Sequence, residues 1–401
     1  MNQAARAFTW REGAVAAAVS LALFAGQGIV FAGMGLALFA SGQALQLGPA
    51  ALGAAFTMVI VGASVGATLP VWLMARIGGR LTMTGGALVM AAGLALAGLA
   101  TGLGLLLPAM ALVGAGFSLL ANTPAYTMIA GWSGPRTERV LGLYLMTGAL
   151  GNAAGPAVGQ ALIDGGIGYW RGTCAIALTL AALLFLVLRD PPESHSPDAP
   201  RTAGWWRPLL NARFAVLALA MVLSQAVIMT ALSVAPAHLT PALGWSDGAV
   251  ARVLAVQGLL GALGTGLAGF ALRHVRAVTL LTLAMVATAL GMGALAQGGA
   301  PMVNWGFVPL FGVGSALVAM AVTVLLMDWF GPETGTAGLA LCWTLAGLAA
   351  LGPGLAGVLA QWTGSYAGAL WLLGGACLPV ALAAAALRPR HQVILAPSSR
   401  A

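Results

Sequence analysis

The chain has 401 residues, of which 60% are hydrophobic and only 6% are charged. A soluble domain carries about 25% charged residues, so this composition excludes a soluble enzyme, a nucleic-acid-binding module and a disordered protein. The 57 glycines lie largely within apolar stretches, where small residues let helices approach closely in a bilayer. We therefore expect an all-α integral membrane protein, with the lipid bilayer as its main solvent.

Long uncharged runs separated by short charged stretches predict the number of membrane spans. A bilayer-spanning helix needs about 20 residues, so 13–75 and 81–135 hold two helices each, and 140–163 and 172–188 hold one each. In the second half, 214–246 and 253–272 hold one each, and 277–327 and 334–387 hold two each. The sequence thus predicts twelve transmembrane helices in two six-helix halves, 1–188 and 214–401.

A polar segment, 189–213, separates the two halves. It holds seven of the 26 charges, five prolines and the pair Trp205–Trp206. Twenty-five residues cannot bury a core of their own. We expect a solvated cytoplasmic linker with an interfacial aromatic anchor.

The basic residues predict the orientation. All 17 are Arg. If the N-terminus is cytoplasmic, fifteen of them fall on the cytoplasmic side of twelve spans and only Arg171 and Arg252 fall outside. This agrees with the positive-inside bias, so the net charge of +8 requires no nucleic-acid partner. We expect both termini in the cytoplasm and a multi-pass location in the plasma (inner) membrane, with the first helix retained rather than cleaved as a signal peptide.

Several features recur at a nearly constant offset. Gln27 returns as Gln225, and Gly114-x-Gly116 returns as Gly312-x-Gly314, each 198 residues later. The basic turn at Arg76 returns at Arg273, and Gly155–Pro156 returns as Gly352–Pro353, each 197 residues later. These repeats predict two halves in the same orientation, related by an axis along the membrane normal.

At this point the chain resembles the major facilitator superfamily over essentially its whole length. The family's loop between helices 2 and 3 usually reads Gly-x-x-x-Asp-Arg-x-Gly-Arg-Arg. Here Arg76, Gly78 and Arg80 match it, and the stretch around Arg273 is a similar copy in the second half. Ala75 and Leu272 stand where the family has the acid that helps to lock the two halves through ionic contacts.

The predicted fifth helix carries a glycine-proline motif that resembles one shared by antiporters of the family. Glycines every four residues form a flat face for close packing, and a proline permits a bend. The alternative interpretation is a packing groove with no role in transport direction. The motif consists of Gly151, Gly155, Pro156 and Gly159.

A fainter similarity is to the bacterial monocarboxylate-porter-like branch. It rests on Met327-Asp-Trp-Phe-Gly331, on Thr363-Gly-Ser-Tyr366, and on Arg171 after Trp170. The resemblance implies a carboxylate solute. Thr265 occupies the position at which many members have the arginine that anchors the carboxylate.

Uncharged polar side chains within the spans are the candidate solute-binding residues. No Asp, Glu, Lys or Arg falls at predicted mid-membrane depth, and a buried amide in lipid must find a partner or face a cavity. Helix–helix hydrogen bonding is the alternative for each of them. His238, at the outer end of the predicted seventh helix, is either an interfacial structural residue or a contact for solute or proton. The candidates are Gln27, Asn122, Asn152, Gln225 and Gln257.

The function that follows is secondary transport of a small organic solute by alternating access. The resemblance to the monocarboxylate-porter-like branch implies that this solute is a monocarboxylate-like compound. The alternatives are an efflux antiporter for amphipathic compounds and a non-transporting receptor on the same scaffold. No phosphate-binding loop is present, since the chain has no Lys, and no motif suggests catalysis, a cofactor or a metal. We expect a monomer with a proton or counter-solute as coupling partner.

Overall fold

The computed structural model describes residues 10–65, 69–191 and 207–387, and these are almost entirely helical. Within these ranges, ten helices are long and apolar enough to cross a membrane, and Pro49–Ser64 is a shorter apolar helix. The predicted all-α membrane fold is confirmed. Much of the predicted linker, including Trp205 and Trp206, lies outside the described residues.

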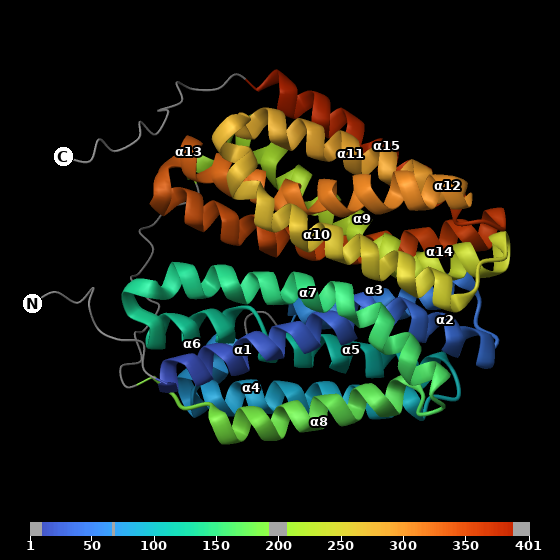
Figure 1. The fold of residues 1–401 in the computed structure, drawn as a ribbon, viewed down its shortest axis with the longest axis horizontal. Helices are drawn as coiled ribbons and strands as arrows, with labels where there is room; N and C mark the ends of the chain where they lie inside the picture. The colour runs from blue at the N-terminus through green and yellow to red at the C-terminus, as the bar shows by residue number, and fades with distance from the viewer. Residues whose placement is uncertain (1–9, 66–68, 192–206, 388–401) are drawn as a thin grey trace, which may run out of the picture.

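The N-terminal half forms one side of the molecule, coloured blue to green in Figure 1. Its long helices lie roughly side by side, and α4 and α8 are farthest from the other half. The elements are α1 (Trp10–Gln27), η2 (Gly28–Ala32), α2 (Met34–Ala44), α3 (Pro49–Val65), α4 (Leu69–Gly98), α5 (Leu103–Leu120), α6 (Thr123–Ser133), η3 (Gly134–Arg136), α7 (Thr137–Asp164) and α8 (Tyr169–Val187).

The C-terminal half forms the other side, coloured yellow to red. Its elements are η4 (Arg207–Leu209), α9 (Ala212–Leu243), α10 (Asp247–His274), α11 (Ala277–Gln297), α12 (Ala300–Met302), η5 (Val303–Phe311), α13 (Gly312–Leu345), η6 (Ala346–Ala350), α14 (Leu351–Thr363) and α15 (Ala367–Ala386).

The molecule has two ends, which we name by residues. The Trp10 end is where α1 begins and where α8 and α15 finish, at the left of Figure 1. The Gly364 end, at the right, is where α2 and α14 finish and α10 begins. The first and the last described helices therefore have their free ends on the same side of the bundle.

Local sequence signals determine several helix ends. The Asn211 side chain accepts a hydrogen bond from the backbone N–H of Phe214 at 3.0 Å and so caps the start of α9. Ser246 caps α10 in the same way. Gly78 and Gly331 have φ near +80°, and each divides one continuous helical segment, α4 and α13, at a kink.

Two helices contain π-helical turns. Residues Gly28–Ala32 form one between α1 and α2, and Val303–Phe311 form a longer one before α13. A π turn holds one extra residue compared with an α turn and is common at functional sites. Both turns interrupt segments that would otherwise cross the bundle as single α-helices.

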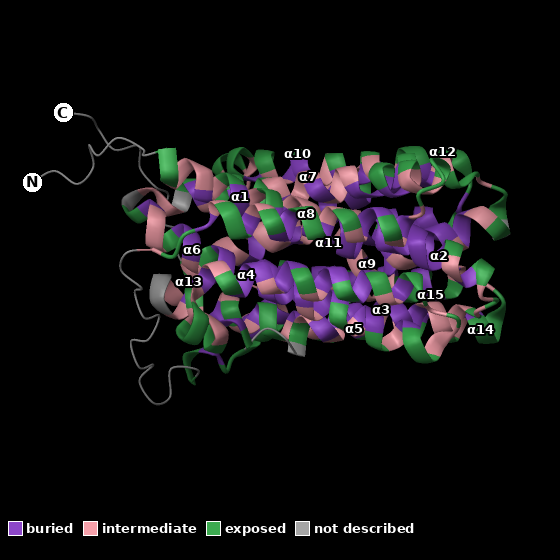
Figure 2. Cartoon of the chain, turned by 90° about the horizontal axis from the view of Figure 1, so that it is seen from below, coloured by how far each residue is buried: buried purple, intermediate pink, exposed green. Residues whose placement is uncertain are grey.

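Exposed residues lie mainly on the outer faces of the bundle, as the colours of Figure 2 show, and buried residues lie between the helices. Many of the exposed residues are large and apolar. Leu186 is 69% exposed and Leu382 is 71% exposed. Such a surface would aggregate in water, but it suits the hydrocarbon of a bilayer.

The internal repeat reappears as a repeated packing contact. A Cβ placed on Gly155 would collide with the backbone of Gly28, and a Cβ on Gly352 would contact the Ala226 carbonyl. Ala226 follows Gly28 by 198 residues, and Gly352 follows Gly155 by 197. The first helical segment of each half thus packs on the glycine-proline helix of the same half in the same way.

Candidate solute pathway

Gln27 and Gln225 lie within helical segments of opposite halves. Gln27 is the last residue of α1, directly before the π turn, and a Cβ placed on Gly148 of α7 would lie 3.5 Å from Gln27 Cγ. Gln225 lies in the middle of α9. Both are half-buried, and neither amide has a hydrogen-bond partner among the described residues. Both amides therefore have hydrogen-bonding capacity that the described part of the protein leaves unused.

Asn122 lies at a break in the fourth helical segment, between α5 and α6. Its backbone has φ +53° and ψ −109°, a rare conformation for a residue with a side chain. The hydroxyl of Tyr144 accepts a hydrogen bond from the Asn122 N–H at 3.1 Å. The side chain of Asn122 is exposed and has no partner within the described chain.

Asn152 and Gln257 come together where α7 of one half crosses α10 of the other. A Cβ placed on Gly258 would lie 2.9 Å from the Asn152 carbonyl carbon, so the two backbones nearly touch. Gln257 is 8% exposed, and the Asn152 Oδ1 atom is buried without a hydrogen-bond partner in the described structure. Sequence reasoning placed these residues in a pathway, and the structure places both at the interface between the halves.

The glycine-proline motif of α7 packs within its own half. Gly151 and Gly155 allow the backbones of Phe24 and Gly28 to approach, and Gly159 lies against the ring of Tyr169. Pro156 lies inside α7. The packing groove that sequence reasoning kept as the alternative is therefore present in this half.

A cavity of about 170 Å³ opens beside this motif, between α1, α7 and α8. Its walls are almost entirely apolar, with Phe24, Ile29, Val158 and Ile176 among them. The Tyr169 hydroxyl at its margin donates a hydrogen bond to the Ile29 carbonyl at 2.7 Å. The cavity therefore offers apolar surface and few unpaired polar groups.

The basic turn at Arg76–Arg80 is held by a residue that the motif does not contain. Asp190, just beyond α8, accepts a hydrogen bond from the Arg80 backbone N–H at 2.9 Å. The Arg80 Nε donates to the Phe185 carbonyl at 2.8 Å, and its guanidinium lies 4.2 Å from the Phe185 ring centroid. Arg76 lies over Trp72. Arg273 is exposed in the last turn of α10, where a cation favours the helix dipole.

The two halves pack most tightly near the Gly364 end. Gly35 of α2 lies against the Leu232 carbonyl of α9, and Gly53 of α3 lies against the Pro353 carbonyl of α14. A Cβ on Gly357 would contact the Pro49 carbonyl. Closer to mid-depth, the Thr57 hydroxyl donates a hydrogen bond to the Ala350 carbonyl at 2.6 Å.

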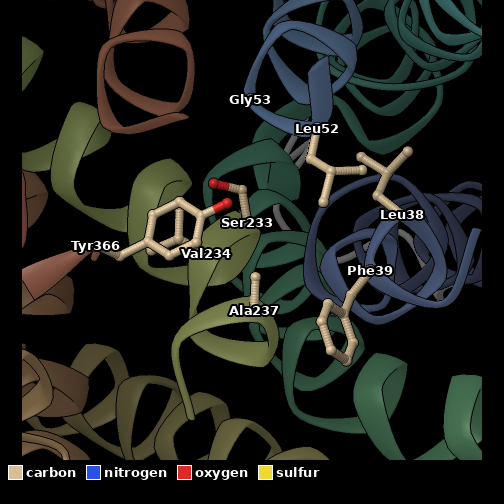
Figure 3. Close-up of a pocket in the computed structure, with 8 residues that line it drawn as sticks. All are labelled: Leu38, Phe39, Leu52, Gly53, Ser233, Val234, Ala237 and Tyr366. Carbon is tan, nitrogen blue, oxygen red and sulfur yellow. The ribbon is translucent and has the colours of Figure 1, made fainter. Parts of the chain in front are cut away.

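Figure 3 shows a small cavity enclosed by this contact. Its volume is about 10 Å³, enough for roughly one water molecule. The hydroxyls of Ser233 and Tyr366 point toward the same space from the C-terminal half. Residues Leu38, Phe39, Leu52 and Gly53 line it from the N-terminal half, and Val234 and Ala237 complete it.

The comparisons with known proteins agree with this architecture. The model of the Major Facilitator Superfamily matches residues 16–348. The chain belongs to this family. A search of curated protein sequences found no match.

The solved structures that resemble this chain include three kinds of transporter. A nucleoside transporter, NupG, superposes with a TM-score of 0.77 at 12% identity, covering 94% of this chain and 99% of that one. A bacterial homologue of the human lysosomal transporter Spinster, in an inward-facing and unoccupied conformation, gives 0.74 at 17% identity, with 94% and 96% covered. A D-xylose–proton symporter gives 0.72 at 17%, with 94% and 98% covered. At these identities the likeness concerns the fold.

His238 has a structural role in this conformation. Its Nε2 lies 3.1 Å from the Leu295 carbonyl and 3.2 Å from the Ala296 carbonyl, both in the last turn of α11. Carbonyls in the last turn of a helix have no intrahelical hydrogen-bond donor, so the imidazole supplies a partner for the end of α11. The Nδ1 atom is buried with no partner in the described residues.

Proposed function

We propose that this member of the Major Facilitator Superfamily is a secondary transporter that moves a small organic solute by alternating access. We infer twelve spans in two six-helix halves, 1–188 and 214–401, joined by the linker 189–213. The Trp10 end faces the cytoplasm of a cell whose plasma (inner) membrane holds the protein as a monomer. A proton or a counter-solute drives the cycle.

The observation that carries this proposal is the one-sided contact between the halves. The closest backbone approaches across the interface, at Gly35, Gly53 and Gly357, all lie toward the Gly364 end. A carrier that admits solute from one side at a time needs such a contact at one end, and it must break during the cycle. Contacts between small residues and carbonyls bury little side chain, so they can re-form without repacking a core.

The polar residues that we assign to the solute pathway are Gln27, Asn122, Asn152, Gln225 and Gln257. They come from both halves, as expected for a site between two rocking units. Their amides lack hydrogen-bond partners in the described structure, and an amide can both donate and accept. An uncharged solute suits them best.

A monocarboxylate-like solute is the second candidate, on the resemblance of Met327–Gly331 and Thr363–Tyr366 to that branch. Arg171 and Arg252 are both exposed, near the Gly364 end of the bundle. A carboxylate in the pathway would have to be held by amides and backbone N–H groups alone, which costs much of its hydration energy. The uncharged solute therefore ranks first.

Export of amphipathic compounds is favoured by a different observation. The apolar cavity of about 170 Å³ between α1, α7 and α8 lies beside the antiporter-like motif. An amphipathic compound could place its apolar part there. This alternative predicts efflux of a lipophilic dye, whereas uptake of a polar solute leaves the dye unaffected.

Counterflow in proteoliposomes tests the proposal. Vesicles preloaded with unlabelled uridine, D-xylose, L-lactate or ethidium receive a trace of the same labelled compound outside. A carrier concentrates the label transiently, and an imposed proton gradient reports coupling. A receptor on the same scaffold gives no counterflow with any of the four probes.

The conformational cycle can be tested without a solute. Spin labels at Arg139 in α7 and Arg273 in α10 report the distance between the halves at the Trp10 end. Alternating access predicts two distance populations, with the shorter one enriched when the contact at Gly35 is prevented from forming. One fixed distance in all conditions contradicts the proposal.

A further inference from the structure

The fourth helical segment is interrupted in the interior of the bundle. The segment runs from Leu103 to Ser133, and α5 stops at Leu120 while α6 starts at Thr123. Leu120, Ala121 and Ala125 beside the break are fully buried, so the backbone groups that the break frees need partners inside the protein. The fully buried Tyr144 satisfies one of these groups, the Asn122 N–H.

Three polar side chains near this break have no hydrogen-bond partner in the described parts of the chain: Gln27, Asn122 and Tyr126. Asn122 is exposed, Gln27 is half-buried, and Tyr126 is 39% exposed. Each is therefore accessible, and each has donor and acceptor capacity that the protein leaves unused.

Independent contacts place these side chains in one region. A Cβ on Gly26 would lie 2.9 Å from the Phe117 ring and 3.9 Å from Leu120 Cδ2, so the end of α1 lies beside the end of α5. Gln27 itself lies against Gly148, one helical turn from Tyr144 on α7. The Tyr126 ring meets the Tyr144 ring edge-on, with centroids 5.7 Å apart and an interplanar angle of 76°.

Tyr144 therefore positions both Asn122 and Tyr126. Its hydroxyl holds the Asn122 backbone and its ring supports Tyr126. Because Tyr144 is completely buried, it acts as a positioning residue. The accessible groups of this cluster are one aromatic ring and two amides, and an aromatic face beside amides is suited to a flat ligand with polar edges.

The charge of the ligand follows from the neighbouring helices. Between Glu12 and Glu138, α1, α5 and α6 contribute no charged side chain, and α7 contributes none between Arg139 and Asp164. α4 also packs on α6, where Gly79 lies against Met128, and it carries Arg76 and Arg80, whose guanidinium groups stack on Trp72 and Phe185. A desolvated ion would find no counter-ion on α1, α5, α6 or this part of α7, and its transfer from water would be strongly unfavourable. A neutral ligand avoids this cost.

We propose that Gln27, Asn122 and Tyr126 form the recognition subsite for an uncharged, planar heteroaromatic solute. The Tyr126 ring stacks on the solute, and the two amides pair with its polar edges. This inference rests on the proposed transport function and narrows it: the N-terminal half, at the broken helix, selects the solute.

The test is binding of three small probes to the purified full-length protein in lipid nanodiscs, measured by calorimetry. Uridine is neutral and planar, benzoate is planar and anionic, and D-xylose is neutral and not planar. We expect uridine to bind at least ten-fold more tightly than benzoate or D-xylose.

Matched variants separate the three contributions. Tyr126→Leu should weaken uridine binding about ten-fold or more, whereas Tyr126→Phe, which keeps the ring, should change it less than about two-fold. Gln27→Met keeps the side-chain length, and Asn122→Gly tolerates the positive φ; each should weaken binding about five-fold. Trp362→Leu, an exposed aromatic on α14, serves as the control and should leave binding unchanged.

The outcomes separate this inference from the transport proposal. Uridine binding that depends on Tyr126, without counterflow, supports the subsite and contradicts transport. Counterflow of D-xylose or L-lactate that Tyr126→Leu leaves intact supports transport and overturns the subsite. The subsite is also overturned if none of the three probes binds. It is overturned as well if wild type and Tyr126→Leu bind uridine equally at equal thermal stability.

Discussion

Asp190 closes the basic turn through the backbone of Arg80. Its carboxylate accepts the Arg80 N–H at 2.9 Å from a position just beyond α8, 110 residues away in the sequence. Gly78, at φ +80°, lies so close that a Cβ there would meet the carboxylate. The turn lacks the family's acid at Ala75, and Asp190, from the segment after α8, supplies an acceptor at this place. The contact joins two helices of the N-terminal half.

Asp190→Ala should therefore destabilise this half. The variant leaves the Arg80 N–H without its acceptor, which costs about 1 kcal/mol at an exposed position. We expect a lower unfolding midpoint for the purified protein, with insertion into the membrane retained. Asp190→Asn keeps an oxygen acceptor and should fall close to wild type. Equal midpoints for all three proteins would show that the contact contributes nothing.

The twelve-span topology can be tested with reporter fusions. We expect external signals for fusions at Gly165, Gly244 and Gly299, and internal signals at Pro197 and Pro332, because the arginines outside the spans then lie mostly in the cytoplasm. An internal signal at Gly244 would contradict the topology. The same fusions in a variant with Arg76 and Arg80 neutralised test how far the basic turn fixes the orientation.

Gly155→Leu should abolish transport without preventing membrane insertion. The substitution places a branched side chain against the Gly28 backbone, where even a Cβ has no room. Gly142→Leu in the same helix is the matched control, because a Cβ there meets nothing within 4 Å. Counterflow and surface expression should be measured together. Normal transport by Gly155→Leu would mean that α1 and α7 can separate at no cost.

Gly35→Val should hold the halves apart at the Gly364 end. The added methyls cannot fit against the Leu232 carbonyl, so the closed contact becomes unfavourable. Labelling of a Ser233→Cys reporter by a membrane-impermeant maleimide should become several-fold faster. Gly368→Val, in open space at the start of α15, should leave the rate unchanged. The chain without the reporter measures the background from Cys174, Cys342 and Cys377.

Gln27→Ala and Gln225→Ala should each raise the apparent transport constant roughly five-fold or more. Losing one hydrogen bond typically costs about 1 kcal/mol, and more if a partner is left unpaired. Protein level in the membrane should stay near wild type. If both amides instead support helix packing, the unfolding midpoint will fall while affinity in the surviving protein is unchanged, and the pair then belongs to the interior packing.

The fold was predictable because its signals are strong and local. Charged residues separate the apolar runs and so mark the helices. The repeats at Gln27/Gln225 and Gly155/Gly352 reflect equivalent helix packing in the two halves, because a contact that requires glycine in one half requires it again in the other.

The site was predictable only in part. The amides were identified because polar residues are rare in the spans. The break at Asn122 also has a local signal, because Asn is a preferred N-cap residue and Pro124 follows in the first turn of α6, but the expectation of two helices in 81–135 made no use of it. The role of Tyr144 depends on a hydroxyl meeting a backbone N–H from another helix. Asp190 was read as part of a solvated linker, and its position under the basic turn arises only when α8 packs against α4.

The π turn at Gly28–Ala32 allows the rotation of α2 about its own axis to change relative to α1. An α-helix advances about 100° per residue, so converting this turn to α-helix would rotate everything beyond it by roughly one residue step. Gly35 would then face away from Leu232, and a bulkier neighbour would take its place. A change confined to this one turn could thus rotate α2 between two packing registers against α9. The preceding α1, with its contacts to α7, would not have to move.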